Sequence, residues 1–229
     1  MKAELGRRVF LGSAVTLGIG SIGVINAAGA LRAEPDGDVV YNEIVGQFMD
    51  AIGRMQGRPD AEAARRVGSS LRLLAAWGQA HRIDDAIRRG IDERVRQHGR
   101  QALLARPFDL RTELVMRGWR LPPGFAPLAT PADFGDSLDD LRVHGITQHW
   151  SDYAAAFEQA AERLHGAPGR LTRVQGAPNE CTGANFMLMM LESQVFLACT
   201  LGLAVGPEFC AVATALVLGW KWRMWAQGC

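Results

Sequence analysis

Residues 199–210 read CTLGLAVGPEFC and place a turn between two cysteines near the end of the chain. Gly206 favours the end of one helix, and Pro207 favours the start of the next. The flanking residues 183–204 and 208–226 are mostly apolar and contain no proline, so both ranges are expected to be helical. This stretch therefore predicts an antiparallel helical hairpin over residues 181–229.

All four cysteines lie in the hairpin segment, at Cys181, Cys199, Cys210 and Cys229, and they allow three pairings. Positions equally far from the turn lie level across an antiparallel helix pair. Cys181 and Cys229 each lie 24 residues from residue 205, whereas Cys199 and Cys210 lie 6 and 5 residues from it. The spacing predicts Cys181–Cys229 and Cys199–Cys210 bonds, and a metal site made by all four thiolates is the alternative.

The two hairpin helices are apolar almost all round, so they belong either in a protein core or in lipid. Residues 209–220 give 12 residues before Lys221, whereas a bilayer span needs about 20. In the first helix, Glu192 lies near the middle, where an acidic residue costs about 2.5–3.5 kcal/mol on insertion scales. Burial under the rest of the chain avoids both problems.

The last residues, GWKWRMWAQGC at 219–229, alternate tryptophans with cations. Tryptophan beside lysine or arginine is typical of a membrane interface, where the rings lie among the headgroups and the charges reach water. Such a run is most often the end of a packed helix, and it would become an interface anchor only if the linker were cut. The candidate membrane-interface residues are Trp220, Lys221, Trp222, Arg223 and Trp225.

Residues 34–165 have helical periodicity interrupted by the proline-rich range 121–131, and residues 166–180 have the composition of a linker. We therefore predict an all-α protein with a helical bundle body followed by a C-terminal disulfide-braced helical hairpin. The apolar positions that define the body helices are Tyr41, Ile44, Val45, Phe48, Ile52 and Met55; Val67, Leu71, Leu74 and Trp77; Ile83, Ile87, Ile91 and Val95; Leu110, Leu114 and Val115; and Tyr153, Phe157, Ala160, Ala161 and Leu164.

The sequence has no recognisable catalytic or metal-binding motif, so we predict no catalytic residue, no cofactor and no metal, and we lean against an enzyme. His144 and His149 would not face one metal ion from a single helix, and His149 with Asp152 would supply only two ligands. An acidic cluster is expected to form helix caps and a solvated face, with a buried carboxylate pair as the alternative; its members are Asp133, Asp136, Asp139 and Asp140. With a net charge of +1, no nucleic-acid partner is expected.

The N-terminus reads GRRVFLG at residues 6–12, followed by a moderately apolar, glycine-rich run and small residues. The adjacent Arg7 and Arg8 resemble the twin-arginine (Tat) export signal, with cleavage near residue 30 or 33. The resemblance implies a signal peptide over residues 1–33, the Tat export machinery as a partner, and export of an already folded protein to the periplasm or the medium. That destination is oxidising, so disulfide bonds would persist there.

The order of a twin-arginine signal, a larger polar segment and a hydrophobic cysteine-containing C-terminal segment is similar in layout to halocin-type bacteriocin precursors. The resemblance implies a secreted membrane-active peptide in residues 181–229, with membrane lipid as its partner and residues 34–165 as its cover. The alternative function is an intact periplasmic binding or accessory protein, or an enzyme without a known motif, whose hairpin is structural core.

Overall fold

The structure is a computed structural model that describes residues 35–56, 60–105, 107–165, 178–200 and 207–229. The predicted signal peptide 1–33 and most of the predicted linker 166–180 lie outside these ranges. Every regular element within them is an α-helix, which confirms the all-α class. The helices are α1 (Pro35–Met55), α2 (Ala61–Ala80), α3 (Ile83–His98), α4 (Arg100–Leu104), α5 (Leu110–Met116), α6 (Pro131–His144), α7 (Ile146–His165), α8 (Pro178–Thr200) and α9 (Pro207–Gln227).

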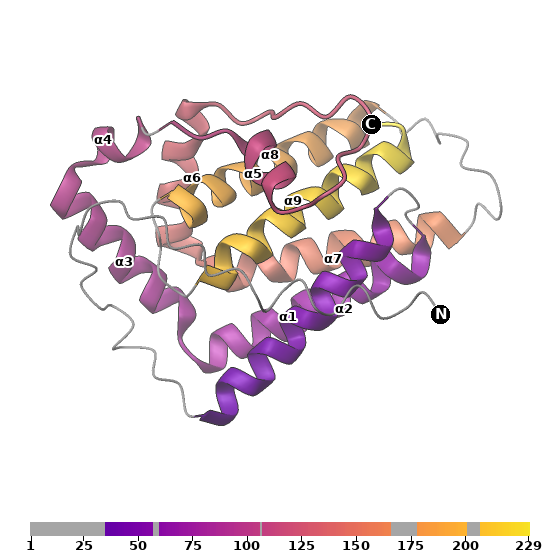
Figure 1. The fold of residues 1–229 in the computed structure, drawn as a ribbon, viewed down its shortest axis with the longest axis horizontal. Coiled ribbons are helices and arrows are strands. Elements are labelled where there is room, and N and C mark those ends of the chain that lie inside the picture. The colour runs from indigo at the N-terminus through magenta and orange to yellow at the C-terminus, as the bar shows by residue number, and fades with distance from the viewer. Residues whose placement is uncertain (1–34, 57–59, 106, 166–177, 201–206) are drawn as a thin grey trace.

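The hairpin α8–α9 runs through the middle of the body and is covered by several of its helices (Figure 1). Helix α8 packs against α6, helix α9 packs against α1, and α5 lies across both. Trp220 of α9 is buried edge-on against the rings of Tyr153 and Phe157 from α7. The hairpin therefore supplies much of the apolar core around which the other helices are arranged.

Helices α1, α2 and α3 bury the stripes that their sequences predict, with Phe48, Leu71 and Ile87 among the most buried side chains. Val115 is an exception, because it is 55% exposed while its neighbour Leu114 is completely buried. Helix α5 has only seven residues, so it makes two turns and can direct few side chains inward. The expectation that Val115 lines the core was wrong.

Helices α2 and α7 approach each other closely over most of their length. A Cβ atom added at Gly68 would lie 3.0 Å from the carbonyl oxygen of Ala154, and one added at Gly78 would lie 2.8 Å from Cγ2 of Thr147. These two glycines therefore allow the α2 backbone to pack directly on α7. Arg72 then reaches across the pair and donates two hydrogen bonds, of 2.6 and 2.5 Å, to the Glu158 carboxylate.

The proline-rich range is irregular as predicted, except that Pro131 is already the first residue of α6. Thr130 and Asp133 form a capping box there, so Asp133 is a helix cap as expected. Helix α6 ends at His144 and is followed by Gly145, whose positive φ of 78° favours glycine. The next helix, α7, begins at Ile146, whose amide donates a 2.7 Å hydrogen bond to Asp84.

Candidate functional site

Both predicted disulfide bonds are present and brace the two hairpin helices. Cys181 pairs with Cys229 at the open end, with 5.4 Å between their Cα atoms, and Cys199 pairs with Cys210 beside the turn, with 4.9 Å. The alternative of a four-thiolate metal site is excluded for this oxidised form, because each sulfur is already bonded to another. Disulfide bonds persist in oxidising compartments, so the two bonds indicate an exported protein.

The bounds of the two hairpin helices differ from the predicted ranges 183–204 and 208–226, and residues 201–204 lie outside the part of the chain that the structure describes. Helix α8 begins at Pro178, five residues before the predicted start and inside the predicted linker, and it ends at Thr200. Proline is favourable in the first turn of a helix because its missing N–H would have no intrahelical partner there. Helix α9 begins at Pro207, as the Gly-Pro pair indicates, and runs one residue past the predicted end at 226.

Glu192 is the most deeply buried carboxylate among the described residues, with 2% of its side chain exposed. One carboxylate oxygen accepts hydrogen bonds from the amides of Leu128 and Ala129, at 2.5 and 2.8 Å. The other lies 3.2 Å from the Nζ atom of Lys221, which is 10% exposed. A buried carboxylate is tolerated when a cation and several donors surround it, and the segment before α6 supplies the donors.

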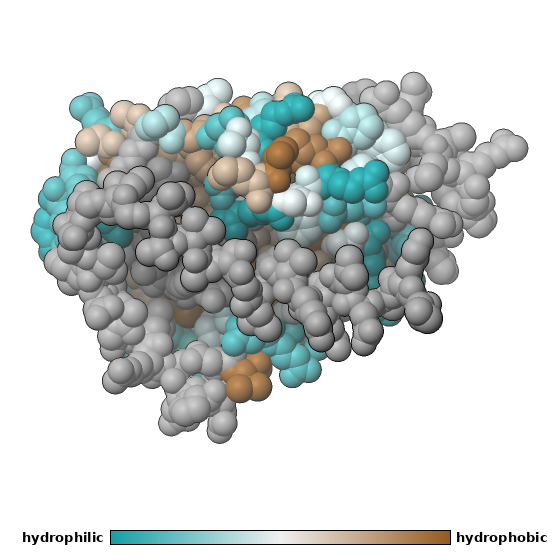
Figure 2. Space-filling view, in the orientation of Figure 1, coloured by the Kyte–Doolittle hydropathy of each residue, from teal (hydrophilic) through white to brown (hydrophobic). Residues whose placement is uncertain are grey.

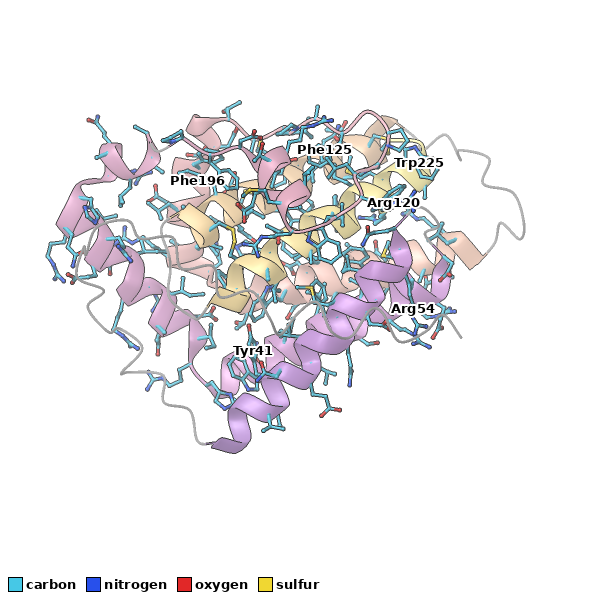
Figure 3. All side chains as sticks on the ribbon, in the orientation of Figure 1. Tyr41, Arg54, Arg120, Phe125, Phe196 and Trp225 are labelled. Atoms are coloured by element: carbon cyan, nitrogen blue, oxygen red, sulfur yellow. A yellow bond between two sulfur atoms is a disulfide. The ribbon has the colours of Figure 1, made fainter. Side chains whose placement is uncertain are left out.

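Lys221 completes this connection between the hairpin and the proline-rich segment. Its ammonium group donates a short hydrogen bond to the carbonyl oxygen of Ala126 and lies 4.8 Å from the centre of the Phe125 ring. Figure 3 shows Phe125, Arg120 and Trp225 gathered around the same end of the hairpin. Glu192 and Lys221 thus fasten the proline-rich segment onto both hairpin helices.

The other polar side chains in the middle of α8 also have partners inside the protein. Ser193 donates to the carbonyl oxygen of Met189 one turn earlier, at 2.9 Å. Gln194 donates to the hydroxyl of Tyr153 on α7, at 3.2 Å, and burial of that hydroxyl raises the pKa of Tyr153. The sequence identified Glu192 as an obstacle to membrane spanning, and the structure gives Glu192 and its neighbours Ser193 and Gln194 each a hydrogen-bond or ion-pair partner.

Four of the five predicted membrane-interface residues are turned into the protein in this conformation. Trp220, Trp222 and Arg223 are 1%, 5% and 8% exposed, and Lys221 is the partner of Glu192. Trp220 donates its indole N–H to the carbonyl oxygen of Ala184, at 3.0 Å. Trp225 is half-buried, edge-on to Trp222.

The remaining side chains of this run hold the C-terminal helix to its surroundings. Trp222 donates its indole N–H to the carbonyl oxygen of Arg120, at 3.2 Å, and Arg223 lies over the ring of Trp220 at 4.2 Å. These contacts are those of a packed helix end, so an interface role for the tail requires a conformation in which it has left the body. No helix in the described ranges has the length and apolar character needed to cross a membrane.

Two of the histidines meet at the junction of α6 and α7. His144 Nδ1 lies 2.8 Å from one oxygen of Asp140, and His149 Nε2 lies 2.7 Å from the other. On a single helix, as the sequence suggests, the two histidines would point in different directions. The helix breaks at Gly145, and both histidines can therefore reach the same carboxylate. Asp152 takes no part in this cluster, because it accepts a hydrogen bond from Gln148.

A shallow pocket of about 370 Å³ lies between α1 and α2, lined by polar and charged side chains. Its charges are already engaged, since Glu62 lies 2.8 Å from Arg66 and 3.6 Å from Arg65, and Asp50 lies 3.0 Å from Arg54. The hydrogen bond from Arg66 lowers the pKa of Glu62. No catalytic arrangement of nucleophile and base is formed by the residues that line this pocket.

Comparison with protein-family models, with curated proteins and with solved structures finds no match for this chain. A functional assignment therefore rests on the chain's own geometry.

Proposed function

We propose that the chain acts in one piece, as an exported binding or accessory protein whose hairpin is the structural core. One observation carries this proposal, namely that three buried polar side chains of the hairpin have hydrogen-bond partners on the body. Glu192 accepts from Leu128 and Ala129, Gln194 donates to Tyr153, and Trp222 donates to Arg120. A hairpin that left the body would lose these hydrogen bonds, and in an apolar environment the Glu192 carboxylate would keep only Lys221 as a partner, which is unfavourable for a buried charge.

The distribution of apolar side chains supports the same proposal. The buried faces of α1, α6 and α7 all contact the hairpin, and those of α1 and α7 also pack on α2. Phe134 of α6 stacks on Phe196 at 4.0 Å between ring centres, and Trp150 of α7 lies 6.2 Å from Phe209. Removing the hairpin would expose a continuous apolar surface on the body, which a soluble exported protein could not keep without aggregating.

A nicking experiment tests this proposal. A specific protease site introduced into residues 166–177 would allow the linker to be cut in the folded, oxidised protein. We expect the two pieces to co-elute in size-exclusion chromatography, because the interface resembles a domain core. Spontaneous separation of the pieces after cutting, without denaturant, would contradict the proposal.

A second function is favoured by one feature of the covalent structure. Both disulfide bonds close within residues 181–229, and neither one joins the hairpin to the body. After a single cut in the linker, no covalent bond would hold the body to this disulfide-closed apolar segment, which ends in tryptophans and cations. This arrangement supports the proposal of a bacteriocin-like precursor, exported by the twin-arginine route, in which the body covers the peptide until release.

Intact masses of the protein recovered from periplasm and medium distinguish the two proposals. One species that runs from about residue 31 or 34 to Cys229 supports the protein that acts in one piece. A short species that starts between residues 171 and 181 supports the precursor. The precursor proposal fails if purified 181–229, with both disulfide bonds formed, leaves anionic vesicles intact.

A further inference from the structure

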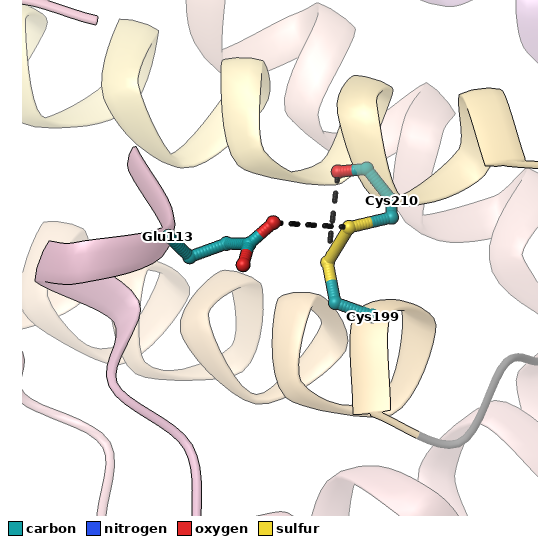
Figure 4. Close-up of side chains that lie close together, drawn as sticks. All are labelled: Glu113, Cys199 and Cys210. Atoms are coloured by element: carbon teal, nitrogen blue, oxygen red, sulfur yellow. Dashed lines mark hydrogen bonds between the residues drawn. A yellow bond between two sulfur atoms is a disulfide. The ribbon is translucent and has the colours of Figure 1, made fainter. Parts of the chain in front are cut away.

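The Cys199–Cys210 disulfide lies beside Glu113 of α5 (Figure 4), and Glu113 forms an ion pair with Arg117 of the same segment. Arg117 donates a hydrogen bond to the Sγ atom of Cys210, at 2.9 Å, and its guanidinium lies 2.6 Å from Oε1 of Glu113. That carboxylate oxygen is 3.8 Å from the same sulfur. A disulfide sulfur has no proton to donate, so in the oxidised form the carboxylate only contacts it.

Three potential metal ligands meet at this place. The carboxylate oxygen of Glu113 and the sulfurs of Cys199 and Cys210 all lie within 4.8 Å of one another, and no other such group was found among the described residues. Cys210 is buried, whereas Glu113 and Cys199 are partly exposed. The folded chain therefore already brings the three residues together, and two of them are partly exposed to solvent.

We propose that reduction of the Cys199–Cys210 disulfide converts this place into a three-ligand site for Zn²⁺, formed by Cys199, Cys210 and Glu113. A dithiol reductant transfers two electrons and two protons to the disulfide, which becomes two thiols, while the reductant becomes a disulfide. Binding of the cation then releases the two thiol protons, because the thiolate is the form that coordinates metal. Three protein ligands leave the fourth tetrahedral position to water.

The charges at the site favour a divalent cation over two bare thiolates. Two thiolates and Glu113 carry three negative charges, and Arg117 compensates only one of them. A partly buried excess of two negative charges is unfavourable, and a divalent cation removes it. Thiolate sulfur selects zinc and similar metals over magnesium and calcium, which prefer sets of oxygen ligands.

The surrounding helices keep the ligands in place after the sulfur–sulfur bond is broken. Leu114, next to Glu113 on α5, is completely buried, and Leu197 and Phe209 anchor α8 and α9 close to the cysteines. The Cys181–Cys229 bond still closes the other end of the hairpin. A chain that folds in a reducing compartment before export, as Arg7 and Arg8 predict, would hold these cysteines as thiols at that stage.

A Co²⁺ titration of the full-length chain tests the proposal, because tetrahedral cobalt thiolates absorb strongly in the visible range. The Cys181→Ser, Cys229→Ser variant leaves only the proposed pair. After reduction with a phosphine and removal of oxygen, it should bind one Co²⁺ per chain with thiolate-to-cobalt bands, and Zn²⁺ should displace the cobalt. The oxidised variant should show no such bands, and bands of equal strength there would overturn the proposal.

Glu113→Gln should lower the affinity of the reduced chain for Zn²⁺ by at least about tenfold. Glu62→Gln is the matched control, because it breaks a similar Glu–Arg pair one helical turn apart, on α2, without approaching a sulfur. It should leave the affinity unchanged. Equal affinities of the two variants, or equal binding by a Cys199→Ser, Cys210→Ser variant, would overturn the proposed ligand set.

A measurement on the wild-type protein tests the same site without relying on variants that could fail to fold. The fully reduced wild-type protein is treated with an alkylating reagent with and without Zn²⁺, and each cysteine is followed by peptide mass spectrometry. Zn²⁺ should protect Cys199 and Cys210 and leave Cys181 and Cys229 reactive. Equal reactivity of all four cysteines in the presence of Zn²⁺ would contradict the site.

Discussion

The helix pair α2–α7 and the helix pair α8–α9 are both packed lengthwise, but they reach their orientations by different means. Helices α2 and α7 are amphipathic, and their charged residues, such as Arg72 and Glu158, mark the side that faces water. Helices α8 and α9 are apolar on all sides. Rotating such a helix in a core changes little buried apolar area, so its orientation is specified by its few polar groups.

Glu192 and Lys221 are the clearest of these polar groups. They are buried in helices that otherwise contain almost only apolar side chains, and they meet each other and the segment 126–129. Burying a polar group is costly unless it has a partner. Only one rotation of the helix about its axis brings the polar group to that partner, so the group determines the orientation of the helix. The difference between the two helix pairs predicts that single polar changes should be severe in α8–α9 and mild on the outer faces of α2–α7.

Leu216→Asp should have the largest effect, because Leu216 is 1% exposed in the middle of α9. A buried and unpaired carboxylate there should cost at least about 4 kcal/mol, a large part of the stability of a typical domain. We expect the whole protein to lose its cooperative unfolding transition in circular dichroism. Phe186→Asp is the matched control in the same hairpin, since Phe186 is 59% exposed and the change should be nearly neutral.

Glu192→Ala should cause the next largest loss in the free energy of unfolding, because it removes the carboxylate that Lys221 and the amides of Leu128 and Ala129 contact. Breaking a buried ion pair from one side costs about 3–5 kcal/mol. Glu192→Gln should cost less, because its amide oxygen can still accept from the two backbone amides. Urea denaturation measures both, and Asp92→Asn, which breaks the exposed Arg142–Asp92 pair, serves as the surface control. Equal effects of Glu192→Ala and Asp92→Asn would refute the role given to the buried pair.

The two disulfide bonds should contribute unequally to the free energy of unfolding. Loop-closure entropy gives about 4 kcal/mol for Cys181–Cys229, which spans 48 residues, and about 3 kcal/mol for Cys199–Cys210, which spans 11. Replacing each pair by serine and measuring unfolding in guanidinium chloride should give losses in that order. The reverse order would contradict this ranking, because it would mean that the Cys199–Cys210 bond at the turn stabilises the protein more than the Cys181–Cys229 bond at the open end.

Glu158→Gln on the outer face of α7 should have the smallest effect, and its size should depend on pH. Hydrogen bonds from Arg72 lower the pKa of Glu158 below its ordinary value of 4.5. The pair therefore stabilises the folded protein above pH 4.5, and this contribution is lost as the pH falls through the lowered pKa. The difference in melting temperature between variant and wild type should be small at pH 7 and should disappear in strong acid. A difference that grows on acidification would contradict this assignment.

The sequence predicts the fold class, both disulfide bonds and most of the buried apolar positions in the helices of residues 34–165, because each of these depends on the spacing of residues along the chain. It does not predict that Glu192 meets Leu128 and Ala129, since the partners are backbone amides of an irregular segment with no side-chain signal. It also does not predict that Asp140 joins His144 and His149, because Gly145 breaks what looks like one helix. The composition of the tail indicated a membrane interface or a packed helix end, and the same residues make buried contacts in this structure because the body encloses them.

Expression of residues 34–165 alone tests most directly whether the hairpin is the core of the protein. The account predicts a fragment that keeps some helix by circular dichroism but has no cooperative thermal transition and binds a hydrophobic dye, because the surfaces that contact Trp220 and Phe196 are exposed. A fragment that unfolds cooperatively, with stability close to that of the intact protein, would contradict the account and favour a releasable peptide.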